Sequence, residues 1–143
     1  MLKSVFLGYA RFTTSDKDPE DFHFISKYVH SKLIKFRVFP TSPINITFSN
    51  ARNISNHTVT FELSASATKL IVNETSIEIY STPNHVGVKF GKLNDYNIQF
   101  TTTNILFNGK ISAKGHFQEL RFIRFASVGH VSWTVEESKL QIV

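Results

Sequence analysis

The chain has 143 residues, no cysteine and a formal net charge of +5. That length fits one domain spanning residues 1–143, and the 41% share of hydrophobic residues is typical of a globular chain rather than a disordered one. The absence of cysteine excludes thiol catalysis, cysteine–zinc sites and a disulfide framework. The positive charge is spread along the chain and predicts only a general attraction to acidic partners.

The N-terminal segment comes first in chain order. Met1–Ala10 contains a short apolar stretch similar to that of a signal peptide, but Arg11-Phe-Thr13 follows at once and continues a strand pattern. We therefore interpret the segment as part of the fold, and no run in the chain approaches the length of a membrane span. The compartment stays open, although four Asn-x-Ser/Thr sequons favour a secreted or extracellular protein. They begin at Asn45, Asn53, Asn56 and Asn73.

The next segment, Asp16–Asp21, is the one place with the chemistry of a helix start. Asp18 stands at a capping position and Pro19 at the first helical position, which predicts a single helical turn. The spacing of its acidic residues also resembles a calcium loop. The EF-hand needs glycine at the position that Asp21 occupies, so a solvated acidic turn is the better interpretation.

From residue 34 onward, apolar side chains alternate with polar ones. This period of two is typical of strands with one buried and one wet face, and such strands usually pair antiparallel. Phe36, Phe48, Phe61, Phe100 and Trp133 are expected to point inward. The alternating segments are 34–38, 44–48, 59–63, 77–79, 86–90, 98–100 and 131–135.

Turn chemistry separates these segments at intervals of about ten residues. Asn108-Gly109 is the strongest signal, because it predicts a two-residue type I′ hairpin with Leu106 opposite Ile111. Short strands joined by turns predict an all-β fold with little or no helix, namely an antiparallel β-sandwich of the jelly-roll or lectin-like type. Further breaks lie at 40–43, 50–53, 83–84 and 91–95.

Motifs for several common chemistries are absent. The six glycines form no phosphate-binding or S-adenosylmethionine loop, and there is no Gly-x-Ser-x-Gly elbow. The six histidines form no close pair of the kind that binds zinc. We therefore assign no catalytic residue, no cofactor and no metal site. A catalytic site assembled from distant strands stays the alternative.

One stretch combines arginine with aromatic rings, as nucleic-acid-binding β surfaces do. In Glu119–Phe125, Arg121 and Arg124 interleave with Phe122 and Phe125. We interpret it as a strand with its phenylalanines in the core and its arginines in water, so a nucleic-acid partner is not expected.

From Tyr28 to Glu136, about three quarters of the chain, the order of features resembles the β domain named after insect farnesoic acid O-methyltransferase. Where that family has a Gly/Trp-rich segment, this chain has Ser64–Ala67 and no tryptophan. The resemblance implies a sandwich used for recognition or carbohydrate binding, implies no methyl transfer, and carries over no functional residue. The matching motifs are Phe36-Arg-Val38, Ile44–Phe48, Phe61-Glu-Leu63, Asn108–Ile111 and Phe122–Trp133.

These observations favour a non-catalytic recognition module of the lectin-like, carbohydrate-binding kind, whose partner is a glycan or another protein. Sugar sites on sandwiches combine a stacking aromatic with fixed polar groups. The alternation of Trp133 with its neighbours favours a core position for that ring. A structural or assembly protein, such as a jelly-roll coat or matrix subunit that forms homo-oligomers, is the alternative. The candidate ligand-binding residues near strand ends are Tyr80, Asn84, His85, Tyr96 and Trp133.

Overall fold

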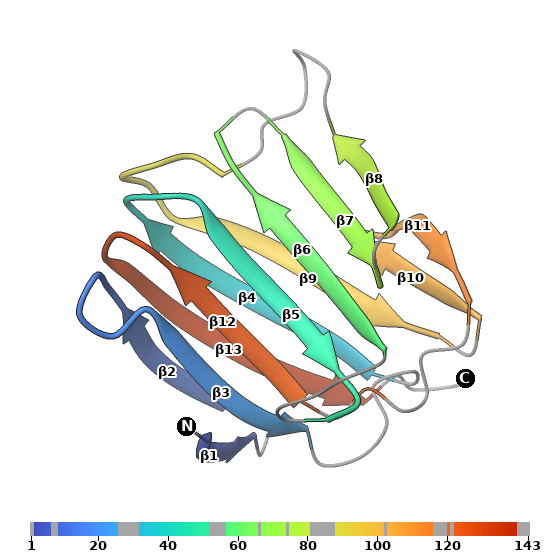
Figure 1. Cartoon of the computed structure of the whole chain (residues 1–143), viewed down its shortest axis with the longest axis horizontal. Helices are drawn as coiled ribbons and strands as arrows, with labels where there is room; N and C mark the ends of the chain where they lie inside the picture. The colour runs from blue at the N-terminus through green and yellow to red at the C-terminus, as the bar shows by residue number, and fades with distance from the viewer. Residues whose placement is uncertain are drawn as a thin grey trace.

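The computed structural model describes most of the chain as strands and short turns. Within the described part the fold is a β-sandwich of a seven-stranded and a six-stranded sheet, without any helix and therefore without one that could span a membrane (Figure 1). The predicted all-β class is confirmed. The described residues are 2–6, 9–25, 32–51, 57–65, 67–73, 75–80, 88–101, 103–115, 120 and 122–139.

Both sheets mix strands from distant parts of the chain. Neighbouring strands are antiparallel, except that β1 pairs parallel with β3. The seven-stranded sheet has the order β1 (Leu2–Phe6), β3 (Glu20–Ile25), β12 (Phe122–Ser127), β5 (Ile44–Ser49), β6 (Thr58–Leu63), β7 (Thr68–Val72) and β8 (Thr75–Tyr80). The six-stranded sheet has the order β11 (Lys110–Lys114), β10 (Asn104–Phe107), β9 (Asn94–Phe100), β4 (Lys32–Pro40), β13 (Val131–Lys139) and β2 (Tyr9–Thr14).

Aromatic rings fill the space between the sheets. Phe48 on β5 meets Phe100 on β9 with ring centroids 4.8 Å apart, and Phe125 on β12 meets Trp133 on β13 at 5.0 Å. Each contact joins the two sheets, so the core is shared rather than divided. The five rings expected to point inward are all buried, which confirms the alternation at Phe36, Phe48, Phe61, Phe100 and Trp133.

A buried chain of hydrogen bonds also ties the sheets together. The indole Nε1 of Trp133 donates to Oγ1 of Thr14 at 2.9 Å, and the Thr14 hydroxyl contacts that of Ser127 on the opposite sheet. Ser127 Oγ in turn donates to the Gly129 carbonyl at 2.8 Å. The indole N–H therefore has a partner, which a buried polar group needs in order not to destabilise the fold.

The predicted hairpin at Asn108-Gly109 is confirmed. Both residues have positive φ, 51° and 82°, as a type I′ turn requires, and Leu106 pairs with Ile111.

The predicted helical turn at 16–21 is wrong. Ser15 N donates to the Asp18 carbonyl at 3.0 Å and closes a bend, and the Pro19 carbonyl then accepts from Ser127 N at 3.0 Å, so the backbone after the bend bonds to β12 and not to a helical turn. Strand β3 then begins at Glu20, which pairs with Ala126 of β12.

The predicted strand at 86–90 is also wrong in its described part. Val88 and Lys89 lie outside any strand and Phe90 lies in a turn, whereas residues 86 and 87 fall outside the described residues. The Asn94 side chain binds both the N–H and the carbonyl of Lys89 at 2.9 Å, which folds the segment back on itself.

Candidate functional site

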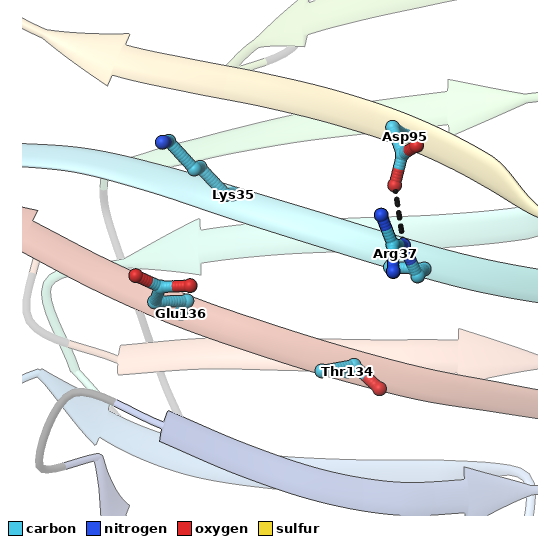
Figure 2. Close-up of a pocket in the computed structure, with 5 residues that line it drawn as sticks. All are labelled: Lys35, Arg37, Asp95, Thr134 and Glu136. Atoms are coloured by element: carbon cyan, nitrogen blue, oxygen red, sulfur yellow. Dashed lines mark hydrogen bonds and ion pairs between the residues drawn. The ribbon is translucent and has the colours of Figure 1, made fainter.

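A hollow lies on the outer face of the six-stranded sheet, where β9, β4 and β13 run side by side. Along each of these strands, every second side chain is buried in the core. The side chains that alternate with the buried ones therefore lie on the outer face of the sheet. The hollow measures about 400 Å³ and is called the Arg37 hollow below (Figure 2). Its lining consists of Lys35 and Arg37 from β4, Asp95 from β9, and Thr134 and Glu136 from β13.

Arg37 is held in place by its neighbour. It pairs across the sheet with Asp95 on one side and Thr134 on the other, and its Nε donates to Oδ1 of Asp95 at 2.9 Å. The hydrogen bond, together with the attraction between the charges, raises the pKa of Arg37 above its ordinary value. The guanidinium therefore stays charged and oriented, with N–H groups left over for a ligand.

Lys35 and Glu136 face each other across β4 and β13. No ion pair joins these two described side chains, and Figure 2 shows their charged groups apart on neighbouring strands. Together with the hydroxyl of Thr134 they give the hollow separate hydrogen-bond donors and acceptors. This set suits a ligand rich in hydroxyl groups, because each hydroxyl both donates and accepts.

A smaller hollow of about 210 Å³ lies on the opposite sheet and is called the Asn45 hollow. Asn45, Glu62 and Lys69 form one row across β5, β6 and β7. Its full lining is Pro43, Asn45, Glu62, Leu63, Ser64 and Lys69.

Two of the residues predicted to bind ligand lie in the interior. Tyr96 is 5% exposed and Trp133 is 2% exposed, so neither ring presents a face at the surface for stacking. The backbone of Tyr80 ends β8 and pairs with Thr68, but its side chain lies outside the described residues, as do Asn84 and His85. For these three residues, ligand contact stays a prediction.

Sequence reasoning did not find the residues that do line the Arg37 hollow. Each occupies a polar position of an alternating strand, where the pattern predicts only exposure. The strands β4, β9 and β13 are neighbours in space but far apart in the chain, and no local pattern reports that order.

The described part of the chain shows no cluster of side chains for metal binding, and its arginine-aromatic stretch does not present all of its rings at the surface. Its His, Asp and Glu side chains form no group of three that could hold a metal ion. In the arginine-aromatic stretch, Phe125 is buried, and Arg124 is exposed with its Nε 3.2 Å from a carboxylate oxygen of Glu20.

No family model matches the chain, and no curated protein matches it in sequence. Solved structures match it in fold. A galectin of Caenorhabditis elegans superposes with a TM-score of 0.64 at 11% identity, covering 90% of this chain and 95% of the galectin. The carbohydrate-binding module CBM66 from Bacillus subtilis gives 0.59 at 10% identity, covering 97% of this chain and all of that one.

A toad ovary galectin in complex with N-acetylgalactose gives a TM-score of 0.56 at 8% identity, covering 87% of this chain and 97% of that one. At such identities the likeness establishes a shared β-sandwich fold. The chain is thus similar in fold to galectins and to a carbohydrate-binding module, and its resemblance to the farnesoic acid O-methyltransferase domain stays a prediction.

Proposed function

We propose that this chain is a lectin-like carbohydrate-binding module rather than an enzyme, and that a glycan binds in the Arg37 hollow. The observation that carries the proposal is the fold shared over most of the chain with galectins and CBM66, one galectin being solved in complex with N-acetylgalactose. The polar lining of the hollow supports the same function, because saccharide hydroxyls need both donors and acceptors.

The chemistry of binding follows from the lining. Arg37 and Lys35 donate hydrogen bonds to sugar oxygens, and Glu136 accepts them from sugar hydroxyls. The strands that carry these side chains are paired in the sheet, so little backbone freedom is lost on binding. Ligand pockets usually measure at least about 300 Å³, which favours the Arg37 hollow over the Asn45 hollow.

The affinity should be low. No aromatic ring is among the described residues that line the hollow, so stacking on these residues contributes nothing. Hydrogen bonds alone compete with water and yield small net free energies. We expect a dissociation constant on the order of a millimolar for a single saccharide unit.

The proposal is tested with a glycan array followed by NMR titration of the sugars that bind. Arg37→Gln should weaken binding at least about tenfold, since charge-assisted hydrogen bonds contribute about 1.5–3 kcal/mol. Arg124→Gln is the matched control, because it removes an exposed arginine paired with a carboxylate on the other sheet. This control should leave the dissociation constant unchanged.

Three results would overturn the proposal. The first is the absence of any glycan binding at millimolar concentration. The second is loss of binding in Glu62→Gln but not in Arg37→Gln, which would place the sugar in the Asn45 hollow. The third is a large closed assembly in light scattering without sugar binding, which would support the structural-protein alternative.

A further inference from the structure

Several turns meet at one end of the sandwich. The turn after β4, the segment 88–93 before β9 and the turn after β12 lie together at the left of Figure 1. Backbone hydrogen bonds join them, from Gly91 N to the Pro40 carbonyl at 2.9 Å and from Thr41 N to the His130 carbonyl at 3.1 Å. We call this part of the molecule the turn end.

The exposed apolar side chains gather here. Among the described residues, three of the four exposed large hydrophobic side chains lie in the turn end, and the fourth lies on β4 just before it leads into these turns. The pairing of β4 with β9 ends at Val38 opposite Asn94, and Phe39 and Leu93 are the next residues beyond that last pair. Isolated exposed apolar residues are ordinary, but their confinement to one end is not. They are Phe39 (40% exposed), Phe90 (43%), Leu93 (62%) and Val128 (77%).

Positive charge accompanies these apolar side chains. Lys89 and Lys92 are exposed on either side of Phe90, and the segment 88–93 contains no acidic residue. The nearest carboxylate along the chain, Asp95, is already paired with Arg37. The acidic bend between β2 and β3 is separated from the segment 88–93 by β4 and β13, but it adjoins the turn after β12, where Ser127 N donates to the Pro19 carbonyl at 3.0 Å.

The segment is also held in shape before any partner arrives. Nδ2 of Asn94 donates to the carbonyls of Lys89 and Lys92, both at 2.9 Å, while Oδ1 accepts from the Lys89 N–H. Gly91 supplies the positive φ of 74° that the turn needs. Little conformational entropy is then lost on docking.

We propose that the turn end docks on an anionic phospholipid bilayer, with Phe90 and Leu93 inserted among the headgroups and Lys89 and Lys92 against the lipid phosphates. Apolar side chains flanked by lysine are the pattern of segments that bind at the membrane interface. Lysine is depleted at protein–protein interfaces, which favours a lipid surface over a protein partner.

The test is sedimentation of the purified chain with vesicles of three parts phosphatidylcholine to one part phosphatidylserine, against vesicles of phosphatidylcholine alone. Binding should require the anionic lipid and should weaken as salt is raised, because salt screens the lysines. The double substitution Phe90→Ser, Leu93→Ser should reduce partitioning at least about tenfold, since apolar burial then no longer contributes.

Matched lysine variants separate a local effect from one of net charge. Lys92→Gln should lower partitioning about fivefold, as expected for one lysine at an anionic surface. Lys114→Gln removes the same charge from β11, where the residue is exposed and away from the turn end, and should have no effect. Thermal unfolding of each variant checks that the fold is intact.

Other outcomes overturn the proposal. One is the absence of binding to phosphatidylserine vesicles, and another is equal loss of binding in Lys92→Gln and Lys114→Gln. Self-association in light scattering that disappears with Phe90→Ser, Leu93→Ser, without vesicle binding, would make the turn end an interface between copies of the chain. Glycan titration of the same variants keeps this result separate from the Arg37 hollow, which the substitutions do not touch.

Discussion

At the residue scale, Asn94 shows how one side chain decides a local conformation. It is 9% exposed and binds the backbone of Lys89 and Lys92 through three hydrogen bonds, while its Oδ1 also accepts from the Tyr96 hydroxyl at 3.3 Å. The segment before β9 therefore forms a closed turn, although Val86, Val88 and Phe90 alternate like a strand. The hydrogen bonds of the Asn94 side chain therefore decide the conformation of this segment, against the strand that the alternation predicts.

Tyr96 leads to a prediction about stability at high pH. Burial raises the pKa of the Tyr96 phenol well above its ordinary value. The unfolded chain ionises this phenol near a pH of about 10, whereas the folded chain retains the proton. The contribution to stability is therefore complete below about pH 9, and it falls as the pH rises above about 10, by up to about 1.4 kcal/mol per pH unit.

Urea unfolding of the wild type and of Tyr96→Phe across this range measures the effect. The variant should lack this part of the pH slope, while the other tyrosines and the lysines affect both proteins alike. Parallel curves for the two proteins above pH 10 would contradict the assignment.

At the element scale, the β10–β11 hairpin depends on the backbone of its turn. The Asn108 N–H donates to the Asn97 carbonyl at 2.8 Å, and the Asn97 N–H donates to Oδ1 of Asn108 at 2.9 Å, so the turn is tied to the neighbouring strand β9. Asn108 and Gly109 both adopt positive φ. The hairpin is thus specified locally by Asn-Gly and then fixed in the sheet by a third strand.

Gly109→Ala should lower the free energy of unfolding by about 1–2 kcal/mol, because a Cβ disfavours the left-handed conformation. A Cβ at Gly109 would meet nothing within 4 Å, so the cost lies in the backbone and not in a clash. Gly109→Asn is the matched variant and should cost less, since asparagine tolerates positive φ. Urea unfolding compares the two, and an equal loss in both would argue against a type I′ turn.

At the scale of the whole molecule, the aromatic contacts between the sheets lead us to expect that the sandwich unfolds as one cooperative unit. Phe48 reaches Phe100, Phe125 reaches Trp133, and Phe61 stacks on Phe107 with centroids 5.5 Å apart. Each pair spans the two sheets. If one sheet unfolds, the apolar face of the other sheet is therefore exposed to water.

Phe48→Ala should therefore destabilise the protein by about 3–5 kcal/mol, the usual cost of deleting a buried ring. Phe39→Ala, on the exposed side of β4, should cost less than about 1 kcal/mol. Guanidinium unfolding monitored by tryptophan fluorescence and by circular dichroism should show one coincident transition for each protein. Separate transitions for the two probes would mean that the sheets unfold independently.

Much of the fold could be predicted because strand faces are a local property. Ile34, Phe36 and Val38 are buried and their neighbours Lys35 and Arg37 are exposed, as the period of two requires. Strand β7 escaped prediction because its alternation is short and ends in three consecutive apolar residues, Leu70–Val72. The expected helical turn at 16–21 is absent because the backbone from Pro19 onward bonds to β12, a strand far along the chain that a local capping pattern does not report.

By itself, then, the sequence determined the all-β class, the inward set of rings and the Asn108-Gly109 turn, because each depends on neighbours within a few residues. Only the tertiary structure decided that β9, β4 and β13 lie side by side, which assembles Lys35, Arg37, Asp95, Thr134 and Glu136 into one hollow. It also gathered Phe39, Leu93 and Val128 at one end. Strand order is set by hydrogen bonds and ring contacts between residues far apart in the chain, and a local sequence pattern does not predict these contacts.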